Sequence, residues 1–385
     1  MISASERLRH LRTSVFSQLA QSKQQQLEKG RDMIDLSIGS PDQPPPLFIR
    51  NCLAELVQRE DQFGYAIHAT EEFKQAVVTY YHKRFQVELA SNQVLQLMGS
   101  QDGLAHLALS FLNPGDVVIA PDPGYPIYSA SVHIAGAELY TIPLKAENDF
   151  KPDLSSIPAE ICRKAKLMIL NYPGNPISSL VEPHFFEEVI SFAKKHQVLL
   201  VHDFAYSELI FDDHKPLSIF SVPGAEEVAV EFNSLSKSFN MAGCRIGYLV
   251  GKPAYIEPLE LLKSHIDYGV FLPIQKAASM ALTSDYTFLE EHRDMYQKRR
   301  DVFLQEISQL GWNVRKPDGG MFIWARIPDS WESALSFALA AIEQGVIVTP
   351  GHAFGKEGER YVRIALVQET EKLIEAAQRL KPLLV

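Results

Sequence analysis

Val228-Ala229-Val230-Glu231-Phe232 is a short, mostly apolar run that leads into Ser234-Leu235-Ser236-Lys237-Ser238-Phe239. The first part is typical of a buried β-strand, and the second places a lysine among hydroxyl groups just beyond the strand end. An amine in this position suits Schiff-base formation, while Ser234, Ser236 and the later Arg245 suit a phosphate on the same small molecule. Pyridoxal phosphate carries both an aldehyde and a phosphate. A solvated turn is the alternative for such a Ser/Lys run when it is taken alone.

The same organisation recurs along the chain. Apolar runs end at loops rich in glycine, proline or polar residues, and helix-like segments such as 182–196 lie between them. The further runs are 94–98, 117–120, 167–170 and 198–201. Unbroken apolar strands that alternate with helices indicate an α/β fold with a mainly parallel sheet. Ligands bind such sheets at the carboxyl ends of the strands, where the polar loops fall.

The length of 385 residues is too great for one compact core, so we expect two domains. From about Tyr286 the pattern changes to a long charged helix at 288–310 and short strands near 346–348 and 361–366. We therefore predict a smaller α+β domain after a large α/β domain. The expected boundaries are 1–45 for an N-terminal arm and part of the small domain, 46–285 for the large cofactor-binding domain, and 286–385 for the small C-terminal domain.

Composition excludes several classes of function. The formal net charge of −10 argues against a nucleic-acid-binding protein, which needs a basic surface. No apolar run approaches the roughly 18 residues of a membrane-spanning helix. Cys52, Cys162 and Cys244 are widely spaced and form no C-x-x-C motif, so we expect reduced thiols, no metal site and a cytoplasmic protein.

Three polar residues after strands suit the pyridine ring of the cofactor. Asp203 ends an apolar run and would pair with a protonated ring nitrogen, which makes the ring an electron sink; bonds to backbone amides are the alternative. Tyr206 would bond the phenolic oxygen of the ring, or serve in packing. Asn175 lies between Gly174 and Pro176 in a turn that would present its amide to the crevice.

Three further positions suit the phosphate, the ring face and an anion. The loop 99–103 opens an apolar helix whose free backbone amides suit a phosphate, although an ordinary helix cap is the alternative. Tyr125 lies between Gly124 and Pro126 and would stack on a flat ring, or pack simply. Arg363 lies within an apolar strand and needs an anionic partner, either a bound anion or a structural acid.

Taken together, these residues resemble the fold-type I, class I/II aminotransferases from about Asp35 to the C-terminus. The matching motifs are Asn175-Pro176, Asp203-x-x-Tyr206, Ser234-x-Ser236-Lys237, Arg245 and Arg363. The resemblance implies a large domain with a mainly parallel, seven-stranded type of sheet and pyridoxal 5'-phosphate as the cofactor. It also implies a homodimer with shared sites, and it is nearest to the alanine, LL-diaminopimelate and aspartate aminotransferase branch.

Residue roles follow from the resemblance. Lys237 is implied as the Schiff-base and proton-transfer lysine, Asp203 as the partner of the pyridine nitrogen, and Tyr125 as the stacking ring. Asn175 and Tyr206 are implied to bond the phenolic oxygen. The residues implied to bind the phosphate are Ser100, Gln101, Ser234, Ser236 and Arg245, with Tyr65 contributed by the neighbouring subunit. Arg363 is implied to bind the substrate α-carboxylate, aided by Asn175 and the backbone of Gly39.

One departure from the family concerns position 101. Some aspartate-using relatives carry a lysine in the phosphate loop where this chain has Gln101, and that lysine helps to hold a second carboxylate. Its absence weakens the case for aspartate as the substrate, unless a residue elsewhere substitutes.

The resulting prediction is a ping-pong aminotransferase that moves an amino group from an L-amino acid to a 2-oxo acid. A carbon–sulfur β-lyase would use the same residues. A non-catalytic regulatory protein is the more distant alternative, and the short arm before the fold argues against the DNA-binding module of such proteins. The sequence leaves the donor side chain and the preferred acceptor open.

Overall fold

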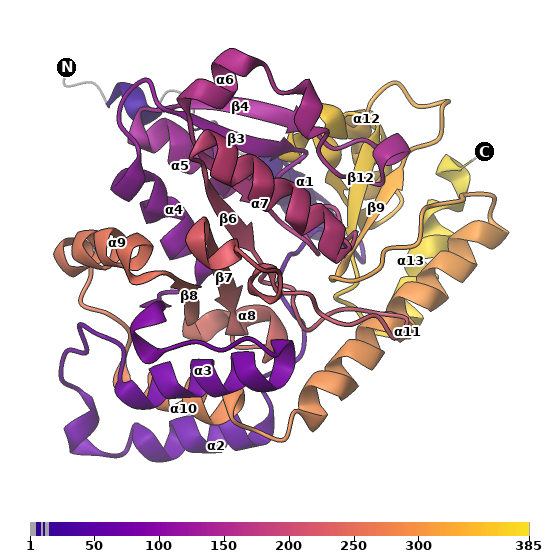
Figure 1. Cartoon of the computed structure of the whole chain (residues 1–385). Coiled ribbons are helices and arrows are strands. Elements are labelled where there is room, and N and C mark those ends of the chain that lie inside the picture. The colour runs from indigo at the N-terminus through magenta and orange to yellow at the C-terminus, as the bar shows by residue number, and fades with distance from the viewer. Residues whose placement is uncertain (1–4, 9–10, 12–14, 385) are drawn as a thin grey trace.

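The computed structural model describes residues 5–8, 11 and 15–384, so the start of the predicted arm lies partly outside the described residues. A seven-stranded sheet runs through the larger part of the molecule (Figure 1). Its strand order is β2 (Val94–Leu97), β8 (Gly247–Gly251), β7 (Ala229–Ser234), β6 (Leu199–Asp203), β5 (Ala165–Leu170), β3 (Val117–Asp122) and β4 (Glu138–Pro143). Only β8 runs against its neighbours, so the prediction of a mainly parallel sheet is confirmed.

The central strands form because their side chains are apolar on both faces. In β5, β6 and β7 nearly every residue is buried, which is the pattern of parallel strands covered by helices on either side. The cluster on one face includes Leu104, Val132 and Leu259, from the helices α4 (Ser100–Phe111), α5 (Pro126–Ala135) and α9 (Pro253–Ile266). The cluster on the other face includes Phe186 and Val189 of α7 (Pro183–His196).

The helices of this part follow the strands in alternation, apart from α2, α3 and α10, which pack together beside β2 and β8 at the foot of Figure 1. Their bounds are α2 (Leu47–Leu56), α3 (Glu71–Phe85), α4 (Ser100–Phe111), α5 (Pro126–Ala135), α6 (Ala159–Lys164), α7 (Pro183–His196), α8 (Leu235–Ser238), α9 (Pro253–Ile266) and α10 (Leu272–Leu282).

A second, smaller assembly contains a three-stranded antiparallel sheet in the order β11 (Thr349–Pro350), β12 (Tyr361–Ala365) and β9 (Phe322–Arg326). A short parallel pair joins β1 (Ile34–Asp35) to β10 (Val346–Ile347). The helices here are α1 (Val15–Glu28), α11 (Thr287–Gln309), α12 (Ala334–Glu343) and α13 (Thr370–Leu380). The N-terminal segment therefore packs with the C-terminal hundred residues, while the boundaries at 45 and 285 stay predictions.

Within the described part of the chain, no helix is both long enough and apolar enough to cross a membrane. The long helix α11 instead carries two buried arginines that pair with acids of distant loops. Arg299 bonds Asp42, with N–O distances of 2.7 and 2.9 Å, and Arg300 bonds Asp212 at 2.7 and 2.8 Å. These pairs tie the helix to a loop from each part of the fold.

Candidate active site

A cleft of about 1040 Å³ lies where loops from the large sheet meet the smaller assembly. All the predicted site residues except Tyr65 line it. They are Gly39, Ser100, Gln101, Tyr125, Asn175, Asp203, Tyr206, Ser234, Ser236, Lys237, Arg245 and Arg363. Asp203 and Ser234 are the last residues of β6 and β7, so the parallel strands bring these groups to one edge of the sheet, as expected.

Lys237 lies in the single turn of α8, directly after β7. Its Nζ donates a hydrogen bond of 2.5 Å to the carbonyl oxygen of Gly39. Burial, with the positive charges of Arg363 and Arg245, lowers the pKa of the Lys237 ammonium to about 8. A larger fraction of this amine is therefore neutral near physiological pH than in an ordinary lysine, and the neutral form is the one that acts as a nucleophile or a base.

His292 of α11 contacts the backbone of Lys237. The sequence did not indicate this residue. Its Nε2 lies 3.0 Å from the backbone carbonyl of Lys237. Burial lowers the pKa of His292 to about 4, so the ring is neutral and its Nε2–H donates to that carbonyl.

Asp203 is a buried carboxylate at the end of β6. Its Oδ2 accepts a hydrogen bond of 2.8 Å from the hydroxyl of Tyr128, and its backbone oxygen accepts one of 2.6 Å from Nδ2 of Asn171. Burial raises the pKa of Asp203, although the bond from Tyr128 opposes the rise. A cation placed beside Asp203 would relieve the cost of burying its charge.

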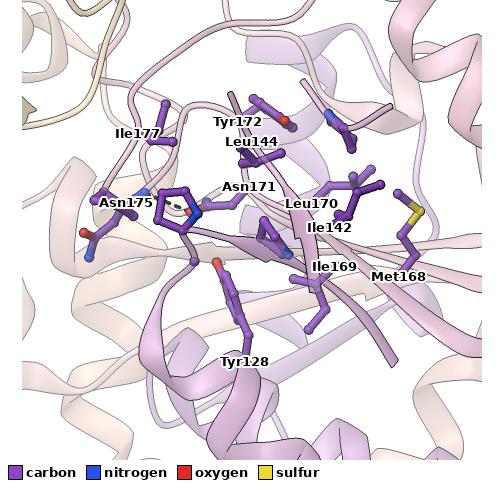
Figure 2. Close-up of a pocket in the computed structure, with 15 residues that line it drawn as sticks. Tyr128, Ile142, Leu144, Met168, Ile169, Leu170, Asn171, Tyr172, Asn175 and Ile177 are labelled. Carbon is purple, nitrogen blue, oxygen red and sulfur yellow. Dashed lines mark hydrogen bonds between the residues drawn. The ribbon is translucent and has the colours of Figure 1, made fainter. Parts of the chain in front are cut away.

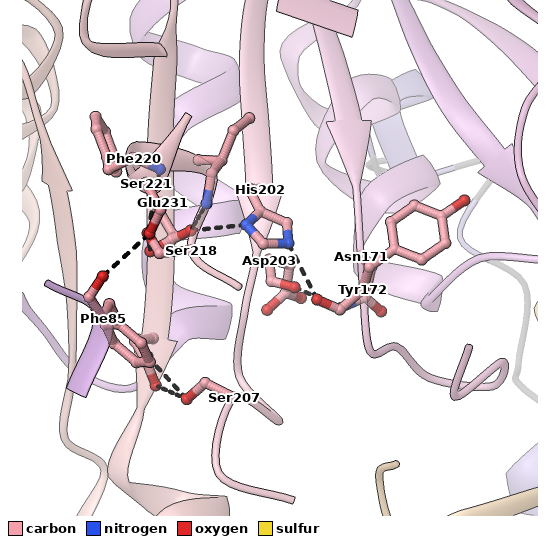
Figure 3. Close-up of polar contacts among 12 residues, drawn as sticks. Phe85, Asn171, Tyr172, His202, Asp203, Ser207, Ser218, Phe220, Ser221 and Glu231 are labelled. Atoms are coloured by element: carbon pink, nitrogen blue, oxygen red, sulfur yellow. Dashed lines mark hydrogen bonds and ion pairs between the residues drawn. The ribbon is translucent and has the colours of Figure 1, made fainter. Parts of the chain in front are cut away.

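A second buried network lies behind Asp203 and fixes the strand that carries it (Figure 3). Nδ1 of His202 lies 2.7 Å from Oε2 of Glu231, and its Nε2 lies 3.2 Å from the carbonyl oxygen of Tyr172. The hydroxyls of Tyr81 and Ser218 each donate to Oε1 of Glu231 at 2.8 Å. His202 and Glu231 are fully buried, and their polar atoms are hydrogen-bonded. The network therefore fixes β6, β7 and the loop after β5 relative to one another.

Arg363 lies in β12 and is almost completely buried, with 2% of its surface exposed. Its Nη1 donates to Oδ1 of Asn175 at 2.9 Å, and its Nη2 donates to the carbonyl oxygen of Ser37 at 2.6 Å. The guanidinium lies 4.3 Å from the ring centre of Phe322 and 4.8 Å from that of Phe354. Its hydrogen-bond partners among the described residues are Asn175, Ser37 and Thr349, none of them an acid, so the predicted alternative of a structural salt bridge is wrong for Arg363.

The groups predicted to hold a phosphate surround the start of α4. Gly99 has φ of +82°, and a Cβ there would lie 2.6 Å from Nη2 of Arg245, so glycine permits the close approach of the guanidinium. Ser234 ends β7 and Ser236 lies in α8, and Oγ of Ser234 accepts from the amide of Ser236 at 3.2 Å. Backbone amides, hydroxyls and a guanidinium thus converge on one end of the cleft.

Tyr125 and Tyr206 contribute aromatic groups to the same cleft. The hydroxyl of Tyr125 donates to Oε1 of Gln101 at 2.9 Å. Tyr206 is buried against Phe322, and the centre of its ring lies 5.9 Å from Nζ of Lys237.

A small cavity of about 20 Å³ lies beside the cleft, behind the loop that carries Asn175 (Figure 2). Its walls include Tyr128, Ile142, Leu170 and Tyr172. This volume holds roughly one water molecule. The loop itself is fixed from within, because the backbone amide of Asn175 donates to Oδ1 of Asn171 at 2.9 Å.

Tyr65 lies outside the cleft of its own chain, with 84% of its surface exposed. Its ring centre lies 5.1 Å from that of Tyr268, and the rings of Phe63 and Phe271 lie 5.4 Å apart in the same segments. The segment around Tyr65, which is predicted to lie at the interface, therefore lies beside the segment around Tyr268, and together they form an exposed aromatic patch.

Comparison with known proteins gives one family and a consistent set of relatives. The family model for aminotransferase class I and II matches residues 31–380. The chain is 40% identical to the LL-diaminopimelate aminotransferase of Aquifex aeolicus over 100% of both chains. It superimposes on substrate-bound BacF from Bacillus subtilis with a TM-score of 0.96 at 35% identity, covering 100% and 98% of the two chains. A probable N-succinyldiaminopimelate aminotransferase from Thermus thermophilus gives 0.91 at 34% identity, covering 96% and 100%.

Proposed function

This chain belongs to the class I and II aminotransferases, and from that membership we propose the role of each residue in the cleft and the identity of the donor. The protein is a pyridoxal-phosphate-dependent aminotransferase that moves an amino group from an L-amino acid to a 2-oxo acid. The relatives whose names state an activity are aminotransferases, and nothing in them supports the carbon–sulfur lyase alternative.

The residues of the cleft fit pyridoxal phosphate. The phosphate would occupy the end formed by Ser100, Arg245 and the two serines after β7, where Gly99 leaves room for the guanidinium. Asp203 is a buried carboxylate whose raised pKa would return toward its usual range beside a pyridinium nitrogen. Asn175 and Tyr206 line the cleft nearby and would bond the phenolic oxygen. Pyridoxal phosphate supplies an aldehyde that condenses with amines and a ring that withdraws electrons from the substrate Cα.

The assignment rests above all on Gly39, which lies between the two groups that an amino-acid substrate needs. Its carbonyl accepts from Nζ of Lys237, and a Cβ on it would lie 3.7 Å from Nη1 of Arg363. A substrate α-carboxylate bound to Arg363 would therefore hold its Cα near the lysine. Lys237, with its pKa of about 8, would take the Cα proton as a general base.

We propose LL-diaminopimelate as the amino donor. Full-length relatives from several bacteria bear that name at 38–40% identity. The cleft is large enough for a long side chain. The test is a donor panel with purified enzyme against 2-oxoglutarate and pyruvate, including LL-diaminopimelate, aspartate, glutamate, alanine, methionine and aromatic amino acids. A higher kcat/KM for any other donor than for LL-diaminopimelate would refute this choice.

We propose in addition that two chains form a homodimer in which each lends Tyr65 to the phosphate of the other. The exposed aromatic patch supports this, because apolar rings at this exposure are typical of a buried interface. Mixing Tyr65→Phe with Lys237→Ala chains tests it. In the heterodimer, the lysine-bearing site receives Tyr65 only if the tyrosine crosses the interface.

Recovery of wild-type cofactor affinity in that lysine-bearing site supports the shared site. Affinity equal to that of the Tyr65→Phe homodimer shows that each Tyr65 serves its own chain, and an active monomer in sedimentation refutes the assembly.

A cytoplasmic location is also proposed, in keeping with three free thiols at Cys52, Cys162 and Cys244. Cell fractionation tests the location.

A further inference from the structure

One cationic residue of the cleft has no part in the proposed mechanism. Four cationic side chains line the cleft among the described residues: Lys23, Lys237, Arg245 and Arg363. The roles proposed above occupy three of them, with the amine at Lys237, the phosphate at Arg245 and the α-carboxylate at Arg363. Lys23 remains, and it comes from helix α1 of the smaller assembly.

Lys23 is held in place at the cleft wall. Leu19 lies one turn earlier on the same face of α1, is buried with Ile342 and Ile347, and also lines the cleft. Nζ of Lys23 lies 2.8 Å from Oδ2 of Asp35, and the two side chains are 34% and 12% exposed. The contacts of Leu19 therefore anchor helix α1, while the ammonium of Lys23 lies at the wall of the cleft.

Asp35 is itself fixed, which makes the position of the ammonium definite. Its Oδ1 accepts hydrogen bonds from the amide and the hydroxyl of Ser37, at 2.9 and 2.6 Å. An ammonium has three donors, and within the described part of the chain Lys23 uses one of them, on Asp35. Two donors are left for a ligand in the cleft.

The same short segment connects Lys23 to the carboxylate anchor. Ser37, which bonds Asp35 through its amide and hydroxyl, accepts from Nη2 of Arg363 through its carbonyl. Two cations of one cleft thus contact the same short segment, Lys23 at Asp35 and Arg363 at Ser37. A substrate with a carboxylate at each end would satisfy both, whereas a substrate with one carboxylate leaves Lys23 without a partner beyond Asp35.

We infer that Lys23 is a specificity-determining residue that binds the distal carboxylate of a long dicarboxylic amino acid, and that Asp35 positions it. This inference rests on the proposed function, because it assumes that Arg363 holds the α-carboxylate. Lys23 would also supply the positive charge for a second carboxylate that some relatives have in a lysine at position 101, where this chain has Gln101. Partly exposed ion pairs contribute little to folding stability, so Lys23 can be replaced without loss of the fold.

The test compares two donors of equal length, L-2-aminopimelate with a distal carboxylate and L-2-aminoheptanoate with none. Wild-type enzyme should prefer the first. Lys23→Met should lower kcat/KM for 2-aminopimelate and LL-diaminopimelate on the order of 10-fold or more, and should leave 2-aminoheptanoate within about twofold. Lys23→Arg should restore most of the loss, since it keeps the charge. Circular dichroism and the visible spectrum of bound cofactor check that each variant is folded and loaded.

A binding measurement separates this inference from the choice of donor. Pimelate and heptanoate are unreactive ligands of matched length, and their inhibition constants are measured with wild type and Lys23→Met. Weaker inhibition by pimelate alone in Lys23→Met supports the role of Lys23, even if LL-diaminopimelate proves not to be the donor. Equal effects on both ligands, no effect on either, or no wild-type preference for a distal carboxylate would overturn the inference.

Discussion

Replacing Arg363 by alanine should lower kcat/KM for every amino donor, because the α-carboxylate is common to all of them. The guanidinium is buried between Phe322 and Phe354, so the contact that it makes with a carboxylate is shielded from water. A hydrogen bond to a charged group contributes about 1.5–3 kcal/mol, and two donors act in a bidentate contact. Some of this is offset, since Nη1 and Nη2 must share their present bonds to Asn175 and Ser37.

The net loss is therefore about 3 kcal/mol, which corresponds to a roughly 150-fold decrease in kcat/KM. Steady-state kinetics with alanine, glutamate and LL-diaminopimelate would measure it, with Arg363→Lys as the matched control that keeps the charge but loses the planar fork. The control should fall between the wild type and Arg363→Ala. Thermal unfolding must be recorded in parallel, because the alanine variant leaves Oδ1 of Asn175 without its donor. A loss confined to acidic donors would refute the reasoning, since it would mean that Arg363 binds the side-chain carboxylate of the donor.

Three further outcomes are expected. Lys237→Ala should retain cofactor through the phosphate contacts, lose the borohydride-fixed lysine adduct and slow transamination by at least about 100-fold; turnover near the wild-type rate contradicts the assignment. The rate at which apoenzyme recaptures pyridoxal phosphate, followed by visible absorbance, should rise with pH with a midpoint near 8, because burial lowers the pKa of Lys237 and only the neutral amine attacks an aldehyde; a midpoint near the ordinary value of 10.5 would contradict this. Tyr128→Phe removes the hydroxyl that bonds Asp203, so the pKa of Asp203 should rise further and kcat/KM should fall about 10-fold, whereas Tyr140→Phe, on the edge strand β4, should not change it.

Much of the fold follows from local sequence patterns, because the buried parallel strands are unbroken apolar runs. The runs at 94–98, 117–120, 167–170, 198–201 and 228–232 correspond to β2, β3, β5, β6 and β7. The strands β4 and β8 give no such signal. The edge strand β4 is half exposed and ends in proline, and β8 is bounded by Gly247 and Gly251, so neither has the composition of a central strand.

The cleft shows a similar division. The residues that line it from loops after strands, such as Asp203 and Lys237, are marked by their position beside an apolar run. Tyr128, His292 and Ser37 carry no such mark, because each acts through a contact with a residue far away in the sequence. A weak signal existed for Tyr128, which lies three residues after Tyr125 and hence on a neighbouring face of the helix that starts at Pro126.

The pairing of β1 with β10 has a consequence for how the enzyme is synthesised. Ile34 lies beside Val346, and Ser37 contacts Arg363. These contacts of the N-terminal segment can form only after nearly the whole chain has left the ribosome. Such nonlocal closure is slow compared with the formation of neighbouring contacts. A nascent polypeptide would therefore contain the residues proposed to bind the cofactor before it contains Arg363, the residue proposed to bind the amino acid.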